Sequence, residues 1–308
     1  MRLAFVFPGQ GSQYVGMGAE IYENYHEARD IFQEASDALG YDVVRLCFDG
    51  PKEELNKTYR TQPGILTVSI GILKVLSSKG IQPSVVAGHS LGEYSALVAA
   101  EVLSFHDAVK LTEKRGQFMQ DAVPKGRGLM AAILGLRRNE IDQICLSLQS
   151  GYAAPANYNC PGQIVIAGES DAVGEAIKRA KESGAQRAVP LAVSVPSHCT
   201  LMAEASRRLA EELNKIEFKS PVVPLVNNAD AIFLTAVDSI KSSLVRQLNN
   251  PLLWEDSIKT ILDSGIEMFI EVGPGKVLSG LIKRIEPSVH VYHVADIKSL
   301  DKTLSALR

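Results

Sequence analysis

The sequence has few cysteines and few aromatic residues. Only four of its 308 residues are cysteine, and they lie far apart, with no C-x-x-C pair of the kind that zinc and redox sites use. This usage is typical of a reduced protein, and we expect a cytoplasmic location. Aromatic residues make up 6% of the chain, with a single tryptophan, so the core must consist mainly of Ala, Val, Ile and Leu.

An excess of one charge and long apolar runs are also missing. The chain has 32 basic and 35 acidic residues, a formal net charge of −3. Because nucleic-acid binders usually show a strong basic excess, we expect no nucleic-acid partner. The longest uncharged stretch, residues 146–168, contains Pro155 and Pro161, which excludes a membrane helix there. The apolar run at residues 3–7 is too short for a signal peptide, so no membrane partner is expected.

Short apolar runs alternate with helical patterns, which is typical of an α/β fold built on a parallel sheet. The predicted strands, each a continuous apolar run, are residues 3–7, 85–88, 222–227 and 268–272. The predicted helical segments are residues 11–39, 62–79, 91–121, 200–216, 238–248 and 255–264. Continuous apolar strands indicate a sheet that is covered on both faces.

The middle of the chain departs from this alternation. Strands are predicted at residues 129–136, 153–158, 163–167 and 186–193, and helices at 139–149 and 170–183, the second capped by Ser170. The order β-α-β-β-α-β is that of the ferredoxin-like unit. We therefore expect a parent α/β domain, residues 1–122 and 194–308, interrupted by a smaller subdomain, residues 123–193.

One motif carries nucleophile chemistry. The predicted strand 85–88 runs into Gly88-His89-Ser90-Leu91-Gly92, and a helical pattern follows at once. This is G-x-S-x-G in a strand–turn–helix context, where the two glycines allow close approach and the serine adopts a strained turn conformation. The first helical N–H groups, starting with Leu91, point toward the serine hydroxyl and can stabilise developing negative charge.

A serine nucleophile needs a base, and six histidines compete for that role. His26 and His106 lie in polar helical patterns, and His290 and His293 in a late strand-like run. His89 is part of the motif itself. His198 follows the predicted strand through Pro196-Ser197 and begins a helix, and such a strand-to-helix corner is where a catalytic side chain is expected in a parallel sheet.

A buried arginine is predicted in the helical pattern after Ser104. Ala108, Leu111, Arg115 and Phe118 recur at spacings of three and four residues, so Arg115 shares an apolar face and points inward. A buried guanidinium needs an anionic or several polar partners. It can form a structural salt bridge, or it can bind a substrate carboxylate in bidentate fashion.

Ordered matches identify a family. The matching segments are Phe7–Gln13 (F-P-G-Q-G-S-Q), Gly88–Ala96 (G-H-S-L-G-E-Y-S-A), Arg115 with Gln117, Asn159–Gly168, Val195–His198, Gln247–Pro251 and Glu271–Gly275. On these segments the chain closely resembles bacterial malonyl-CoA:acyl-carrier-protein transacylases along essentially its full length. The resemblance implies an α/β-hydrolase-like core with a ferredoxin-like insertion.

The resemblance also implies the site. Ser90 would be the nucleophile and His198 the general base, oriented by the backbone carbonyl of Gln247. Gln10 and Leu91 would contribute their amide N–H groups to an oxyanion hole. Arg115 would bind the malonyl carboxylate. No carboxylate is attractive as a third triad member, since the candidates lie in or beside helical patterns: Asp107, Asp121, Asp142 and Asp171.

The implied activity is ping-pong transfer of malonyl from malonyl-CoA to the phosphopantetheine thiol of holo acyl carrier protein, for fatty acid synthesis. It needs no metal or other cofactor, because thioester is exchanged for thioester. Nothing in the sequence indicates a coiled coil, and a monomer is expected. The alternatives are an esterase or thioesterase, an acyltransferase that serves a polyketide synthase, and a non-catalytic protein that docks the carrier. Basic groups that could meet an acidic carrier are Lys178, Arg179, Lys181, Arg187, Arg207 and Arg208.

Overall fold

The computed structural model describes residues 2–124, 126–191, 193 and 195–307, and the larger of its two sheets is built on parallel strands. The strands of this sheet are β1 (Leu3–Phe7), β2 (Val85–Gly88), β7 (Leu225–Val226), β8 (Phe233–Leu234), β9 (Met268–Val272) and β10 (His290–Val294). Their order across the sheet is β10-β9-β1-β2-β7-β8. All neighbours are parallel except β7 and β8. The predicted α/β class is confirmed.

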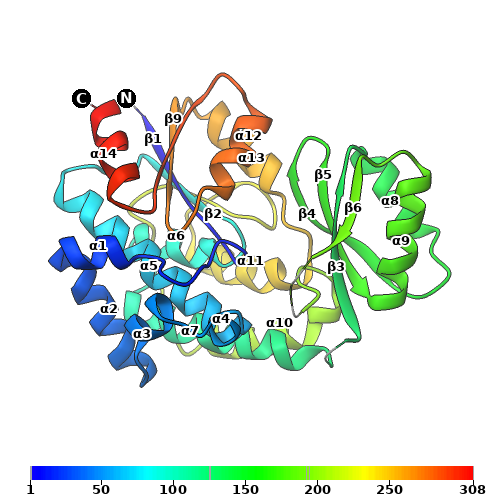
Figure 1. The fold of residues 1–308 in the computed structure, drawn as a ribbon, viewed down its shortest axis with the longest axis horizontal. Helices are drawn as coiled ribbons and strands as arrows, with labels where there is room; N and C mark the ends of the chain where they lie inside the picture. The colour runs from blue at the N-terminus through cyan, green and yellow to red at the C-terminus, as the bar shows by residue number, and fades with distance from the viewer. Residues whose placement is uncertain (1, 125, 192, 194, 308) are drawn as a thin grey trace.

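Helices cover both faces of this sheet (Figure 1). They are α1 (Ala19–Asn24), α2 (His26–Leu39), α3 (Val43–Phe48), α4 (Lys52–Leu55), α5 (Thr58–Ser78), α6 (Gly92–Ala99), α7 (Phe105–Ala122), α10 (Ala203–Leu213), α11 (Val237–Asn249), α12 (Trp254–Asp263), α13 (Val277–Ile285) and α14 (Ile297–Ala306), with a 3₁₀ turn η1 (Thr200–Met202) before α10. Helices α12 and α13 pack on one face and α2, α5, α6, α7, α10 and α11 on the other.

The central strand shows why its sequence is continuously apolar. In β1, Phe5 and Phe7 pack into the core beneath α5, whereas Ala4 and Val6 pack into the core beneath α12. Successive side chains of a strand point to opposite faces, so a strand that is covered on both sides needs apolar residues at every position. All five residues of β1 are buried.

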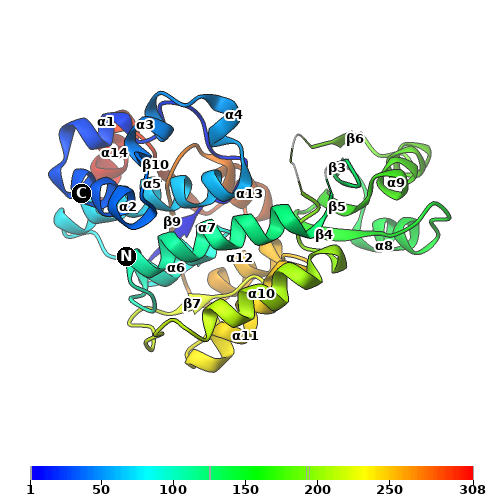
Figure 2. The ribbon, with the colours of Figure 1, turned by 90° about the horizontal axis from the view of Figure 1, so that it is seen from below.

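The second sheet is antiparallel and belongs to the middle of the chain. Its strands are β3 (Gly128–Leu134), β4 (Ala153–Cys160), β5 (Gln163–Glu169) and β6 (Arg187–Pro190), in the order β4-β5-β3-β6, with helices α8 (Arg138–Leu146) and α9 (Ser170–Glu182). Together they follow the predicted β-α-β-β-α-β order. Figure 1 shows this unit, in green, at one side of the larger body. In Figure 2, α7 lies beside α10 and extends toward the green unit.

Several predicted boundaries were wrong, and backbone conformation explains them. The predicted helix 11–39 begins only at Ala19, because Gly18 adopts a left-handed φ of 82°, and it is broken at the extended residue Tyr25. The predicted helix 91–121 is two helices, since Glu101 has a φ of 58° and Ser104 caps a new helix, accepting a hydrogen bond from the Asp107 amide.

Other differences concern short elements and one cap. Ser170 does not cap α9: the N-cap is Glu169, and the Ser170 hydroxyl donates instead to the Gly126 carbonyl. The predicted strand 222–227 pairs only over Leu225–Val226. Helices α3, α4, α13 and α14 and strand β8 were not predicted. The last strand of the insertion was predicted at residues 186–193 and is observed as Arg187–Pro190. The predicted range includes Ala192, which lies outside the described residues.

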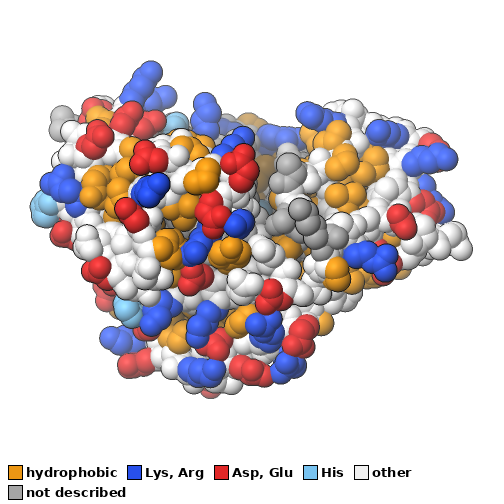
Figure 3. Space-filling view, turned by 60° about the horizontal axis from the view of Figure 1, so that its bottom comes forward, with side chains coloured by type: hydrophobic (Ala, Val, Ile, Leu, Met, Phe, Trp, Pro, Cys, Tyr) orange, Lys and Arg blue, Asp and Glu red, His pale blue; other side chains and the backbone are white. Residues whose placement is uncertain are grey.

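The surface is hollowed between the two parts of the molecule (Figure 3). A pocket of about 210 Å³ is lined by residues of both parts, among them Ser90 and Leu91 from the larger body and Asn157, Asn159 and Val165 from the smaller sheet. The fold thus places the carboxyl ends of β1 and β2, where ligands of open α/β sheets bind, against the insertion.

Candidate active site

Two glycines create a tight turn that presents Ser90. A Cβ on Gly88 would lie 1.9 Å from the Gly92 carbonyl oxygen, and one on Gly92 would lie 2.0 Å from the Phe7 carbonyl oxygen. No other residue type allows β1, β2 and α6 to approach so closely. Between the glycines, Ser90 has a φ of 54°, a left-handed conformation that is costly for a side chain with a Cβ. The strained turn predicted from the motif is confirmed.

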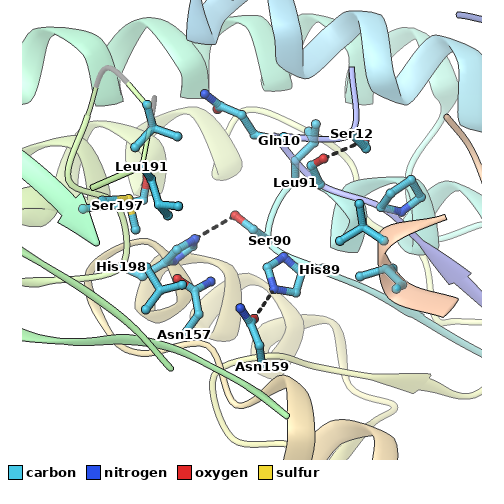
Figure 4. A pocket seen from close by; sticks show the side chains of 18 of the residues that line it. Gln10, Ser12, His89, Ser90, Leu91, Asn157, Asn159, Leu191, Ser197 and His198 are labelled. Atoms are coloured by element: carbon cyan, nitrogen blue, oxygen red, sulfur yellow. Dashed lines mark hydrogen bonds between the residues drawn. The ribbon is translucent and has the colours of Figure 1, made fainter. Parts of the chain in front are cut away.

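Ser90 faces His198. The Ser90 Oγ lies 2.8 Å from His198 Nε2, although the two residues are 108 positions apart in the chain. His198 also has a left-handed φ, 60°, and its Nδ1 lies 2.7 Å from the Gln247 carbonyl oxygen. Because a carbonyl can only accept, Nδ1 carries the proton and Nε2 presents its lone pair to the serine hydroxyl. Figure 4 shows the hydroxyl and the imidazole pointing toward each other across the pocket.

The surroundings of His198 keep its ring neutral. The side chain is 3% exposed, and burial together with the nearby positive charge of Arg115 lowers its pKa to about 3. A neutral imidazole with a free Nε2 can accept a proton at neutral pH. The arrangement therefore has a hydroxyl, a base and a group that orients the base, which is the minimum for nucleophilic catalysis by serine.

Arg115 reaches the same point from α7. It is 1% exposed, as its place on the apolar face of the helix predicted. Its Nη1 donates to Gln62 Oε1 at 2.8 Å, and its Nη2 donates to Gln247 Oε1 at 3.0 Å and to Ser90 Oγ at 3.2 Å. Its Nε has no hydrogen-bond partner among the described residues. A fully buried guanidinium beside the serine, with neutral partners and an unused N–H, can bind an anionic group.

Gln10 and Leu91 line the pocket across from His198 (Figure 4). Gln10 follows β1, and Leu91 is the residue before the first turn of α6. Neither amide N–H donates a hydrogen bond to an acceptor among the described residues. Backbone N–H groups that lie beside a nucleophile and have no other partner can stabilise an oxyanion.

Asn228, which was not predicted as a site residue, holds the serine turn. Its Oδ1 accepts from the Ser90 amide at 2.8 Å, and its Nδ2 donates to the Gly88 carbonyl at 2.8 Å. Asn228 follows β7, which pairs with β2 in the sheet, so both residues come to the same edge. A polar residue just after a predicted strand was the available signal.

Gln62 and Glu93 are two further buried polar residues that were missed. Gln62 lies on α5 at the start of a long apolar stretch, and its side chain contacts both Arg115 and the Met119 sulfur. Glu93 lies on α6 and accepts hydrogen bonds from the Gln247 side chain and the Asn228 amide. A polar or charged residue near the start of an apolar helical run was the signal in both cases.

The remaining candidates from the sequence do not contact Ser90 as a base or join His198 as a third triad member. His89 lines the pocket, but its Nε2 lies 2.9 Å from Asn159 Oδ1 and its ring packs edge-on against Trp254. The other four histidines do not line the pocket, and neither do the four aspartates considered for a triad: Asp107, Asp121, Asp142 and Asp171. The His198 Nδ1 faces a carbonyl, not a carboxylate.

No group of three or more His, Cys, Asp or Glu side chains within the residues that the structure describes could hold a metal ion. No helix within residues 2–124, 126–191 and 195–307 is long and apolar enough to cross a membrane.

The fold and site define a class: an α/β protein with a serine on a strand–turn–helix elbow, hydrogen-bonded to a histidine. Comparison with known proteins narrows this class. Residues 4–300 match the family model described as acyl transferase domain. The chain is 53% identical over 286 residues to the malonyl CoA-acyl carrier protein transacylase of Escherichia coli, covering 92% of this chain and 93% of the relative.

Solved structures agree with this assignment. An acyl carrier protein S-malonyltransferase from Vibrio cholerae superposes with a TM-score of 0.96 at 50% identity, covering 98% of this chain and 100% of the other. A malonyl-transacylase in complex with its type II PKS acyl-carrier protein gives a TM-score of 0.97 at 48% identity, covering 99% and 100%. The chain belongs to the acyl transferase family.

Proposed function

We propose that this chain transfers the malonyl group of malonyl-CoA to the phosphopantetheine thiol of holo acyl carrier protein, supplying malonyl units for fatty acid synthesis. The observation that carries the proposal is the convergence of three groups: the Ser90 Oγ lies 2.8 Å from His198 Nε2 and 3.2 Å from Arg115 Nη2. The relatives named as malonyl-transferring enzymes, at 53% and 50% identity over nearly the whole chain, support the same substrate.

In the first half-reaction, His198 Nε2 takes the Ser90 proton while Oγ attacks the thioester carbonyl carbon of malonyl-CoA. The amides of Gln10 and Leu91 stabilise the oxyanion. The carbon–sulfur bond then breaks, the CoA sulfur takes the proton from His198, and malonyl-Ser90 remains. The Gln247 carbonyl holds the Nδ1 proton throughout and stabilises the imidazolium as it forms.

In the second half-reaction the carrier thiol gives its proton to His198 and attacks the ester. The serine–acyl bond breaks, Ser90 recovers its proton, and the malonyl thioester leaves on the carrier. Thioester is exchanged for thioester, so the proposed reaction needs no metal or redox cofactor. We propose that the position of the pocket between the two parts of the molecule limits access of water to the ester.

Arg115 indicates which acyl group the site accepts. A malonyl thioester carries a free carboxylate, and the buried guanidinium beside Ser90 is placed to pair with it. An esterase or thioesterase has no need of such a cation next to its nucleophile. We therefore favour malonyl transfer over hydrolysis.

We propose a catalytic part of residues 1–122 and 194–308 and a smaller part of residues 123–193; the positions Met1, Ser194 and Arg308 lie outside the described residues. We also propose a cytoplasmic monomer without a nucleic-acid or membrane partner. Of the basic candidates for carrier docking, three already pair with carboxylates: Arg179, Arg207 and Arg208. The proposed docking groups are therefore Lys178, Lys181 and Arg187.

A polyketide carrier is a second candidate acceptor, because one similar structure is a malonyl-transacylase in complex with its type II PKS acyl-carrier protein. Transfer rates to a fatty-acid carrier and to a polyketide carrier, measured side by side, decide between them. Faster transfer to the polyketide carrier would replace the acceptor proposed above.

Intact-protein mass spectrometry after mixing with malonyl-CoA tests the chemistry. The expected result is a mass gain of one malonyl group, absent in Ser90→Ala and removed by holo acyl carrier protein. Release of free malonate at a comparable rate without any carrier would instead indicate a hydrolase.

A further inference from the structure

Glu93 is a buried carboxyl group that the proposed chemistry does not use. Its side chain is fully buried in α6, three residues after the nucleophile. One oxygen, Oε2, accepts from Gln247 Nε2 at 2.8 Å and from the Asn228 amide at 3.0 Å. The other oxygen, Oε1, has no hydrogen-bond partner among the described residues. Buried carboxylate oxygens are normally satisfied, so this one needs an explanation.

The Gln247 side chain links Glu93 to Arg115. Its Oε1 accepts from Arg115 Nη2 at 3.0 Å, and its Nε2 donates to Glu93 Oε2 and, at 3.1 Å, to the Ser90 carbonyl. The carboxyl group and the guanidinium therefore share one amide group. No direct ion pair joins them within the described part of the chain.

The charge of this buried cluster depends on two groups. Arg115 from α7 is cationic, and Glu93 can be anionic or neutral. His198 is neutral because burial and the Arg115 charge lower its pKa, and Tyr94 is neutral because burial raises its pKa to about 12. Asp230, which follows β7, also acts on Glu93 and disfavours a second negative charge. Above pH 7, an ionised Glu93 thus balances Arg115 when no substrate is bound.

A substrate carboxylate disturbs this balance. Once it pairs with Arg115, an ionised Glu93 becomes an excess negative charge in a fully buried environment, which is costly. A proton on the unpartnered Oε1 removes that charge and leaves both hydrogen bonds to Oε2 in place. Resting on the proposed function, in which a malonyl carboxylate binds Arg115, we propose that Glu93 is a positioning residue that takes a proton from solvent on Oε1 when the substrate carboxylate enters and returns it when malonyl leaves.

The titration of Glu93 fits this role. Burial raises the pKa of its carboxyl group to about 7, and the hydrogen bonds from Gln247 and the Asn228 amide, followed by the positive charge of Arg115, limit the rise. Neutralisation of Arg115 by a substrate carboxylate removes the last of these effects and raises the pKa further. The proton is therefore taken up at physiological pH, and binding of malonyl is linked to pH.

The proposal predicts a pH dependence that distinguishes two ligands. If the pKa of Glu93 is about one to two units higher in the complex, the Kd for malonyl-CoA rises about three- to fivefold between pH 7 and pH 8. The Kd for acetyl-CoA, which shares the CoA part and its phosphates but lacks the carboxylate, stays constant over this range. In Glu93→Gln, whose side chain cannot titrate, the malonyl-CoA dependence disappears.

Isothermal titration calorimetry tests this in the non-reacting Ser90→Ala background. Titrations at pH 8 in two buffers of different ionisation enthalpy give the number of protons taken up. The expected result is about 0.4 to 0.8 more protons for malonyl-CoA than for acetyl-CoA, and no such excess in Ser90→Ala/Glu93→Gln. No excess in Ser90→Ala, or an excess that survives in the double variant, overturns the proposal.

Two controls keep the outcomes separate. If Glu93→Gln does not fold, Glu93→Asp replaces it, and the measurement is the infrared C=O band of a protonated carboxyl group. This band must appear when malonyl-CoA binds to Ser90→Ala, and it must shift in Ser90→Ala/Glu93→Asp. Absence of the band, or of its shift, overturns the proposal. Failure of the proposed function has a different signature, namely that wild type forms no malonyl-enzyme. A malonyl-enzyme that forms without excess proton uptake removes only the role of Glu93.

Discussion

Replacement of Arg115 by alanine should change which acyl-CoA the protein prefers. The guanidinium is 1% exposed and lies 3.2 Å from the Ser90 hydroxyl, so a malonyl carboxylate that pairs with it is removed from water. Loss of one partner of such a desolvated charge pair costs about 2–5 kcal/mol. At 1.4 kcal/mol per factor of ten, the preference for malonyl-CoA over acetyl-CoA should fall about 30- to 3,000-fold.

The readout is the ratio of kcat/KM values for the two substrates, measured for wild type and Arg115→Ala. Both values are expected to fall somewhat, because Arg115 also donates to Ser90 Oγ and Gln247 Oε1, but the malonyl value must fall much further. Arg137→Ala, which removes an arginine that is 78% exposed, is the matched control and should leave the ratio unchanged. Equal losses on both substrates in a folded Arg115→Ala protein would refute the carboxylate clamp.

Four further outcomes are expected. Gln10→Ala should retain far more transfer activity than Ser90→Ala, because its contribution is a backbone N–H; equal losses in steady-state assays would argue against that role. The acid limb of kcat/KM should lie well below pH 6.5, since burial keeps His198 neutral; a limb at or above pH 6.5 contradicts this. Gly92→Ala should unfold at lower urea concentration or fail to fold, because its Cβ would lie 2.0 Å from a carbonyl oxygen; wild-type stability would show that the elbow can relax. Burial raises the pKa of Glu93 from 4.5 to about 7, so between these pH values the native state holds a proton that the unfolded state has lost. As pH rises from 4.5 through 7, the free energy of unfolding of wild type should therefore fall by about 3 kcal/mol relative to Glu93→Gln, measured by urea unfolding. A difference between the two proteins that does not change with pH would contradict this.

The linked side chains around Gln247 suggest why the site is built from amides. Gln247 orients His198 with its backbone carbonyl and contacts Arg115, Ser90 and Glu93 with its side chain. A carboxylate in the place of the carbonyl would raise the pKa of the imidazole and would compete with the substrate for Arg115. A neutral orienting group avoids both effects, which fits a pocket that must accept an anionic acyl group.

The local part of the structure was predictable from the sequence. Short apolar runs predicted β1, β2 and β9 to the residue, because strands that are covered on both faces carry mostly apolar side chains, with Glu271 of β9 as a buried exception. The G-x-S-x-G motif predicted the turn at Ser90, since only glycine tolerates the close contacts on either side. The spacing around Arg115 predicted its burial, because helical periodicity fixes which residues share a face.

Only the tertiary structure decided which polar groups meet. Asn228 and Glu93 are 135 residues apart, and Gln62 and Arg115 are 53 apart, yet each pair forms a buried hydrogen bond. Such contacts depend on strand order and helix packing, which no local pattern encodes. Sequence periodicity therefore determined the helices and strands and which single side chains are buried. The packing of β2 against β7 and of α5 against α7 determined which charged and hydrogen-bonding groups meet in the site.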